Sequence, residues 1–158
     1  MNIELKNIKY SSFASQETSC FDATIYIDGK KIGTVENDGN GGSNIYHPFQ
    51  IGEMLNNHAK TLPKVKYQEY EFEQNADTII NDLLMEHLYA KDLKRALAKR
   101  ILFINAEGEL RETIGLDKNR MTAMLASPVL PEKLKSKTIL NLLPFDEAFK
   151  VYRTQVAH

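Results

Sequence analysis

The residues best suited to chemistry gather in one glycine-rich loop of eleven residues, positions 37–47. Five of the eight glycines of the chain lie between positions 29 and 42. Backbone N–H groups without a neighbouring Cβ can approach a phosphate closely, and a helix expected to begin at Pro48 would favour an anion there. The groups that could bind a ligand or a partner belong to Asp38, Asn40, Gly41, Gly42, Ser43, Asn44, Tyr46 and His47.

The spacing within this loop departs from the established phosphate and calcium motifs. No Gly-Lys-Ser or Gly-Lys-Thr follows it, and glycines at positions 39, 41 and 42 do not give Gly-x-Gly-x-x-Gly. Asp38 and Asn40 fit the first two ligand positions of a calcium loop, but Gly42 and Ser43 break the next two. Three interpretations stay open: a turn that needs positive φ, which we favour, a contact with a partner, and an anion or nucleotide site.

The first candidate for a general base is His47, the one histidine in the glycine-rich loop. Its other role would be to help cap the next helix. His58 and His87 lie within apolar stripes and are expected to be partly buried, and His158 is expected to be disordered. Cys20, the one cysteine, falls in a predicted strand and is expected to be a buried, inert thiol. We therefore expect no catalytic residue, no metal and no cofactor. The alternative is a nucleotide- or phosphoester-processing enzyme with His47 as its base.

The predicted long helix over residues 75–98 has an unequal distribution of charge. Residues 69–86 contain six acids and no Lys or Arg, whereas residues 91–100 contain five basic residues and one acid. Acids at the start and bases at the end complement the helix dipole, which is the interpretation we favour. The alternative is a patch for nucleic-acid phosphates, formed by Lys94, Arg95, Lys99 and Arg100. The acidic residues could instead present a phosphate-mimicking surface to a basic host protein.

The periodicity of apolar residues predicts the elements that position these groups. Strands are expected over residues 2–10, 20–28 and 30–35, and the Asp28-Gly29 turn is a strong hairpin signal. Helices are expected over residues 48–62, 75–98 and 117–126 and from Pro144 onward, with further strands over 64–73, 101–104 and 110–114 and a strand or an apolar linker over 138–143. The fold class is α+β: a single domain over residues 1–158, in which an antiparallel, hairpin-rich sheet packs with about four helices. A β-hairpin region, 1–47, would precede a mixed helix and strand region, 48–158.

Composition limits the classes of function. The chain has 158 residues, with 20 Lys and Arg against 21 Asp and Glu, which argues against a polybasic nucleic-acid binder over the whole length. One cysteine excludes an intramolecular disulfide and a cysteine-based zinc site. No apolar run is long enough for a secretion signal or a membrane span. We expect a cytoplasmic protein that does not interact with a membrane.

Three stretches resemble small uncharacterised proteins of bacteriophages and related mobile elements. In residues 17–47 the resemblance rests on the run Asp28-Gly29-Lys30-Lys31-Ile32-Gly33-Thr34-Val35, followed by Asn37-Asp38-Gly39 and Gly41-Gly42. Residues 91–104 and 139–153 resemble the C-terminal part of the same group. The resemblance implies an accessory protein of a phage or mobile element, in the cytoplasm of the host. Such proteins often bind and block a host factor.

From these observations we expect a non-catalytic, intracellular binding protein whose partner is a host protein. Inhibition of a host-defence system, as by an anti-CRISPR, is one form that this function would take. The glycine-rich loop and the charged ends of the long helix would be its contact surfaces. A nucleic-acid-binding module that uses the basic end of the long helix is the further alternative.

Overall fold

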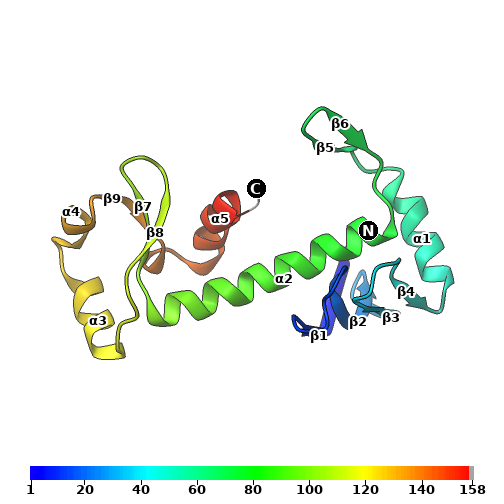
Figure 1. The fold of residues 1–158 in the computed structure, drawn as a ribbon, viewed down its shortest axis with the longest axis horizontal. Helices are drawn as coiled ribbons and strands as arrows, with labels where there is room; N and C mark the ends of the chain where they lie inside the picture. Colours follow the sequence, from blue (N-terminus) through cyan, green and yellow to red (C-terminus); the bar gives the residue numbers. More distant parts are fainter. Residues whose placement is uncertain (157–158) are drawn as a thin grey trace. The chain divides into compact units, whose positions relative to one another are not determined.

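The chain forms a mixed helix and strand structure with antiparallel sheets, which confirms the predicted α+β class (Figure 1). The computed structural model describes residues 1–156. Backbone contacts divide the chain into two compact units, Met1–Glu86 and His87–His158, and the long helix α2 (Ala76–Lys99) belongs to both. This division falls at residue 86 and not near residue 47. That the whole chain is a single domain stays a prediction.

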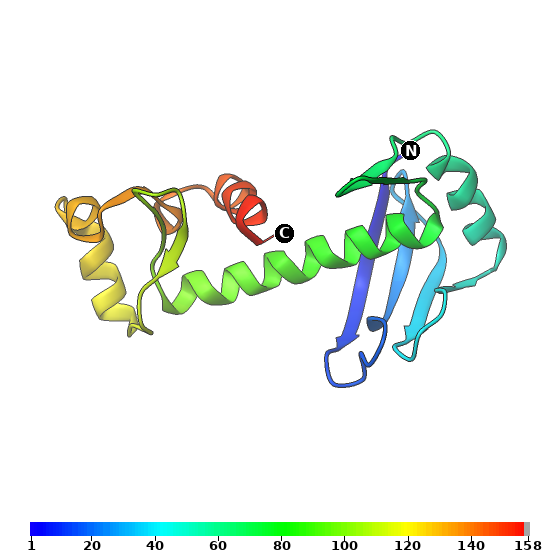
Figure 2. The same ribbon diagram turned by 45° about the horizontal axis from the view of Figure 1, so that its top comes forward.

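The first unit is built on a four-stranded antiparallel sheet in the order β1-β2-β3-β4 (Figure 2). Its strands are β1 (Ile3–Ser11), β2 (Cys20–Ile27), β3 (Lys30–Asp38) and β4 (Ile45–His47). The predicted hairpin between β2 and β3 is confirmed, with positive φ at both Asp28 and Gly29. Alternation along β2 places Phe21, Ala23 and Ile25 on one buried face.

Helix α1 (Gln50–Ala59) and the first half of α2 supply further buried residues of this unit. Ile51 and Leu55 from α1 are buried, as are Ile80 and Leu84 from α2. The Asn56 side chain at the end of α1 accepts a 2.7 Å hydrogen bond from the backbone N–H of residue 76 and so connects the two helices.

Helix α1 begins later than the sequence predicts. The expected helix over residues 48–62, with Pro48 in its first turn, spans only Gln50–Ala59. His47 still belongs to β4, where it pairs with Thr34 of β3, and the His47–Pro48 peptide bond is cis. The chain is therefore extended up to His47 and needs residues 48 and 49 to turn into the helix.

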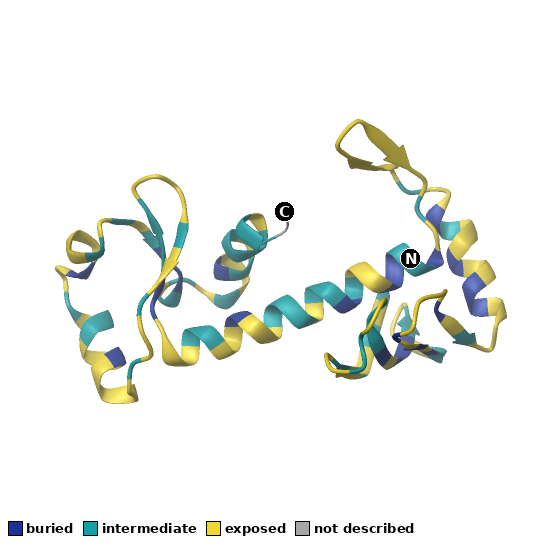
Figure 3. Cartoon of the chain, in the orientation of Figure 1, coloured by how far each residue is buried: buried dark blue, intermediate teal, exposed yellow. Residues whose placement is uncertain are grey.

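The segment predicted as one strand, 64–73, is a small hairpin of two strands, β5 (Val65–Tyr67) and β6 (Tyr70–Phe72). It forms a separate two-stranded sheet in which every strand residue is exposed (Figure 3). Gln68, at the turn between the strands, has a φ of 54°.

Helix α2 confirms the predicted long helix over 75–98, with Asn75 as its N-cap. The Asn75 side chain accepts a 2.9 Å hydrogen bond from the backbone N–H of Thr78. The buried side of α2 changes along its length, in contrast to the single apolar stripe that the sequence predicts. Leu84 and Leu93 are both fully buried, but nine residues, about 2.5 turns, place them on opposite sides of the helix.

The second unit contains a three-stranded antiparallel sheet in the order β8-β7-β9. Its strands are β7 (Leu102–Asn105), β8 (Leu110–Glu112) and β9 (Ser136–Ile139), and its further helices are α3 (Lys118–Ala126), α4 (Leu130–Leu134), the 3-10 helix η1 (Leu140–Leu142) and α5 (Phe145–Val156). One core cluster contains Leu93, Leu102, Leu140 and Ala148. A second contains Ile101, Met121, Leu130 and Ile139.

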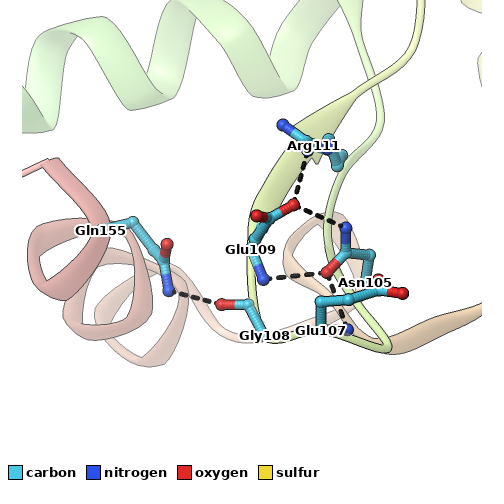
Figure 4. Close-up of polar contacts among 6 residues, drawn as sticks. All are labelled: Asn105, Glu107, Gly108, Glu109, Arg111 and Gln155. Atoms are coloured by element: carbon cyan, nitrogen blue, oxygen red, sulfur yellow. Dashed lines mark hydrogen bonds and ion pairs between the residues drawn. The ribbon is translucent and has the colours of Figure 1, made fainter.

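The turn between β7 and β8 is organised by one asparagine side chain (Figure 4). Asn105 Oδ1 accepts hydrogen bonds from the backbone N–H groups of Glu107 and Glu109, at 3.0 and 2.9 Å. Gln155 of α5 donates a 3.1 Å hydrogen bond to the Gly108 carbonyl at the tip. This polar cluster therefore connects the turn to α5.

Candidate functional site

The glycine-rich loop is organised around the buried side chain of Asn37, at the end of β3. Asn37 Oδ1 accepts hydrogen bonds from the Thr18 hydroxyl, at 2.7 Å, and from the backbone N–H of Gly39, at 2.9 Å. Its Nδ2 donates to Asn44 Oδ1 at 3.0 Å and to the Gly42 carbonyl at 3.2 Å. One side chain thus holds the start, middle and end of the loop.

Gly39 connects the loop to the turn that precedes β2. Its carbonyl oxygen accepts hydrogen bonds from three successive backbone N–H groups, those of residues 16, 17 and 18, at 2.8 to 3.2 Å. Its φ is +85°, and a Cβ at this position would lie 2.2 Å from the carbonyl oxygen of Ala14. A glycine is therefore required here for both the backbone conformation and the close approach.

The second half of the loop is attached to the start of α2. Asn44 donates from its backbone N–H to Asp77 Oδ2 at 3.2 Å and from its side chain to Asn81 Oδ1 at 3.2 Å. The Tyr46 hydroxyl donates to Asp77 Oδ1 at 2.7 Å. Burial, and then the hydrogen bond to Asp77, raises the pKa of Tyr46 far above its usual value. Two of the predicted binding residues are thus engaged within the chain.

Four backbone N–H groups of the loop that could contact a phosphate are also engaged within the chain. Those of Gly39, Asn40 and Gly41 donate to the side chains of Asn37, Asp38 and Thr18, and the N–H of Asn44 donates to Asp77. Two carboxylates, Asp38 and Asp77, accept in this network, and their charge opposes an incoming phosphate. The geometry therefore supports a structural role for the loop. We call it a structural clasp, because its hydrogen bonds connect the end of β3 to the turn before β2 and to the start of α2. Asp38, Asn40, Gly41, Gly42, Ser43 and His47 remain exposed on its surface.

His47 lies on β4, with Nε2 3.4 Å from Glu36 Oε1 on the neighbouring strand, and both side chains are more than half exposed. It makes no capping bond to α1, whose N-cap is Phe49, so the predicted capping role is wrong. Within residues 1–156, no group of three or more His, Cys, Asp or Glu side chains is arranged to hold a metal ion.

The other candidate side chains differ in part from expectation. His58 is half-buried as predicted, but His87 is exposed. It lies on the same side of α2 as Ile80 and Leu84, and this side of the helix is buried at those two residues but not at residue 87. Cys20 is half-buried and not fully buried, since alternation along β2 directs it to the face opposite Phe21. His158 lies outside the described residues.

The four basic residues proposed for phosphate contacts, Lys94, Arg95, Lys99 and Arg100, are all exposed. Two of them have partners within the second unit. Arg100 forms an ion pair with Glu112, and Lys94 Nζ lies 5.1 Å from the centre of the Phe145 ring. Arg95 and Lys99 have no such partner in the described chain. The exposed Lys91 precedes Arg95 by four residues, as Arg95 precedes Lys99, so the three side chains lie along one side of α2.

The hairpin β5–β6 is a surface feature that the sequence analysis missed. Its register pairs Val65 with Phe72 and Tyr67 with Tyr70, so these four side chains share one face. Their exposed fractions are 42, 54, 65 and 64%, respectively. The opposite face carries the Lys66–Glu71 ion pair, at 3.5 Å. The alternation Glu69-Tyr70-Glu71-Phe72-Glu73 was the signal that could have identified this face.

Comparison of the chain with models of known families, with curated proteins and with solved structures finds no match. In the part of the chain that the structure describes, none of the helices is both long and apolar enough to cross a membrane.

Proposed function

We propose that this chain is a non-catalytic binding protein that docks a protein partner through the apolar face of the β5–β6 hairpin. The observation that carries the proposal is the exposure of Val65, Tyr67, Tyr70 and Phe72 on one face of a two-stranded ribbon. A hairpin of this size gains little stability by itself, and exposed apolar clusters of this kind mark interaction sites. Tyrosine is also enriched among the residues that dominate binding energy.

Charge around the hairpin defines the chemistry of the partner. Glu69 and Glu73 flank the two aromatic residues of β6, whereas Glu71 is paired with Lys66 on the opposite face, and residues 67–90 contain no Lys or Arg. We propose a protein partner with an apolar groove to receive the aromatic side chains and basic side chains along its rim. The outer edges of β5 and β6 also leave backbone groups free to pair with a strand of that partner.

The resemblance to phage proteins supports a host protein as this partner and its inhibition as the outcome. The clasp geometry gives the enzyme alternative no support, since four backbone N–H groups of the loop donate to side chains of the same chain and two carboxylates accept within the network.

Replacement of the two aromatic residues of β6 tests the proposal. Tyr70→Ser with Phe72→Ser should reduce recovery of a partner from host-cell lysate by about 100-fold or more, because each such contact contributes about 2 kcal/mol. Both side chains are exposed, so the melting temperature should change by less than about 2 °C.

The matched control is Lys66→Ser with Glu71→Ser on the opposite face of the same hairpin, which should leave recovery unchanged. Equal recovery by the wild type and the aromatic variant would contradict the proposal. So would an equal loss in both variants, because that result would implicate the fold of the hairpin and not its apolar face.

A further inference from the structure

We infer a second binding surface in the second unit: a strip of basic side chains that binds the phosphate backbone of double-stranded nucleic acid. The basic strip consists of Lys91, Arg95 and Lys99 on α2 and Lys118 and Arg120 on α3. This inference is independent of the hairpin proposal, because the two surfaces share no residue.

Charge is divided unequally between the two units, although the whole chain is almost neutral. Residues 1–86 contain 7 Lys and Arg against 13 Asp and Glu. Residues 87–158 contain 13 Lys and Arg against 8 Asp and Glu. The second unit taken alone therefore attracts polyanions, which the overall charge of −1 conceals.

The three α2 residues of the basic strip follow one another in a row along one side of the helix. Positions 91, 95 and 99 are separated by four residues each, so their Cα atoms are spaced by about 6 Å along the axis and span about 12 Å. That length corresponds to about three to four steps of a duplex, at about 3.4 Å per step. All three are exposed, whereas Leu93, on the other side of the helix, is fully buried.

A backbone hydrogen bond brings the start of α3 next to the end of this row. The N–H of Leu116 donates to the carbonyl oxygen of Lys99 at 2.7 Å. Lys118 and Arg120, which follow two and four residues later, are both exposed, but because they are two residues apart on α3 they point to different sides of it, so no more than one of them contacts the same duplex as the row. The acid between them and the row, Asp117, caps α3 by accepting a 2.8 Å hydrogen bond from the Arg120 backbone N–H.

Several other basic side chains of the unit have partners within the chain, whereas the exposed Lys133, Lys135, Lys137 and Lys150, which lie outside the basic strip, form no ion pair in the described residues. Arg100 and Arg111 form ion pairs with Glu112 and Glu109. Arg153 lies over the Tyr89 ring, with 4.7 Å from its guanidinium carbon to the ring centre. Among residues 1–156, no carboxylate forms an ion pair with any of the five side chains of the basic strip.

The basic strip is suited to a duplex more than to a single strand. Single-strand sites combine cations with exposed aromatic rings on which bases stack. None of the exposed aromatic side chains of the described chain lies in the second unit. Contacts would therefore be to phosphates alone, which predicts binding without sequence preference and with a strong dependence on salt.

Fluorescence anisotropy of the full chain with a dye-labelled DNA duplex of about 20 base pairs and mixed sequence tests the inference. For about four phosphate contacts, the logarithm of the binding constant should fall with the logarithm of salt concentration with a slope of about −4. Arg95→Glu with Lys99→Glu should weaken binding at least about 10-fold at 50 mM salt, and Arg95→Gln with Lys99→Gln should show a smaller loss in the same direction.

The matched control is Lys30→Glu with Lys31→Glu, which makes the same change in net charge on exposed residues of the first unit. It should change the affinity by less than about 2-fold. An equal loss in this control would overturn the inference, as would the absence of binding at 50 mM salt. Salt-sensitive self-association without duplex binding would also overturn it, because the basic strip would then engage the acidic unit of a second copy.

Discussion

Replacement of Asn37 by alanine tests whether the glycine-rich loop is a structural clasp. This change removes four hydrogen bonds of 2.7 to 3.2 Å around a side chain that is only 7% exposed. It leaves the Thr18 hydroxyl, the Asn44 amide and a loop carbonyl without these partners. At about 1 kcal/mol for each bond, with part of the loss regained from water at the loop surface, the free energy of unfolding should fall by about 3 kcal/mol.

Urea denaturation followed by circular dichroism measures this loss directly. For a chain of this length, 3 kcal/mol also corresponds to a decrease in melting temperature of about 6 to 12 °C. The matched control is Asn40→Ala, at an exposed position of the same loop, which should change the free energy of unfolding by less than about 0.5 kcal/mol.

A loss below about 1 kcal/mol in Asn37→Ala would refute the reasoning, because the network would then contribute nothing beyond an ordinary surface contact. Similar losses in Asn37→Ala and Asn40→Ala would refute it too. In that case the loop would be sensitive at every position and would not depend on one buried side chain.

Three further predictions concern other polar and backbone contacts, each measured by urea denaturation. Gly39→Ala should lower the free energy of unfolding by at least about 3 kcal/mol, because its Cβ would lie 2.2 Å from a backbone oxygen. Gly29→Ala, at nearly the same φ but with open space around it, should lower it by about 1 kcal/mol. Equal losses in the two variants would contradict this prediction. Tyr46→Phe removes the 2.7 Å hydrogen bond to α2 and should cost about 1 to 2 kcal/mol at pH 8. Because the folded-state pKa of Tyr46 is raised, its contribution is complete below pH 10 and is lost as the pH rises further, so the difference between wild type and variant should shrink above pH 10; a constant difference would contradict the assignment. Asn141→Ala should cost about 2 kcal/mol, because its side chain bonds to three backbone groups at the end of α2 and the start of β7; a loss below about 0.5 kcal/mol would contradict that role.

Local patterns were sufficient to predict most elements of the fold. Alternation identified β1 to β3, and the Asp28-Gly29 turn joins two strands as expected, because both signals depend only on neighbouring residues. The length of α2 and its N-cap at Asn75 follow from equally local signals. The start of α1 could not be found in this way, since it depends on pairing of His47 with Thr34, thirteen residues earlier.

The candidate site was harder to predict than the fold, because a residue type does not show where its hydrogen bonds go. Asn44 and Tyr46 were reasonable ligand-binding residues by type, but their polar atoms bond to α2, more than thirty residues away. The aromatic side chains of β6 were assigned to a strand, for which burial of one face is the usual expectation. Only the structure shows that nothing in residues 1–156 covers them.

Site-specific photo-crosslinking tests most directly whether the hairpin is the docking surface and the glycine-rich loop is not. A benzophenone side chain would replace Phe72, on the apolar face of the hairpin, and in a second protein Asn40, at the exposed surface of the loop. After irradiation in host-cell lysate, we expect one protein to be crosslinked from position 72 and none from position 40. A partner crosslinked from position 40 but not from position 72 would contradict this expectation.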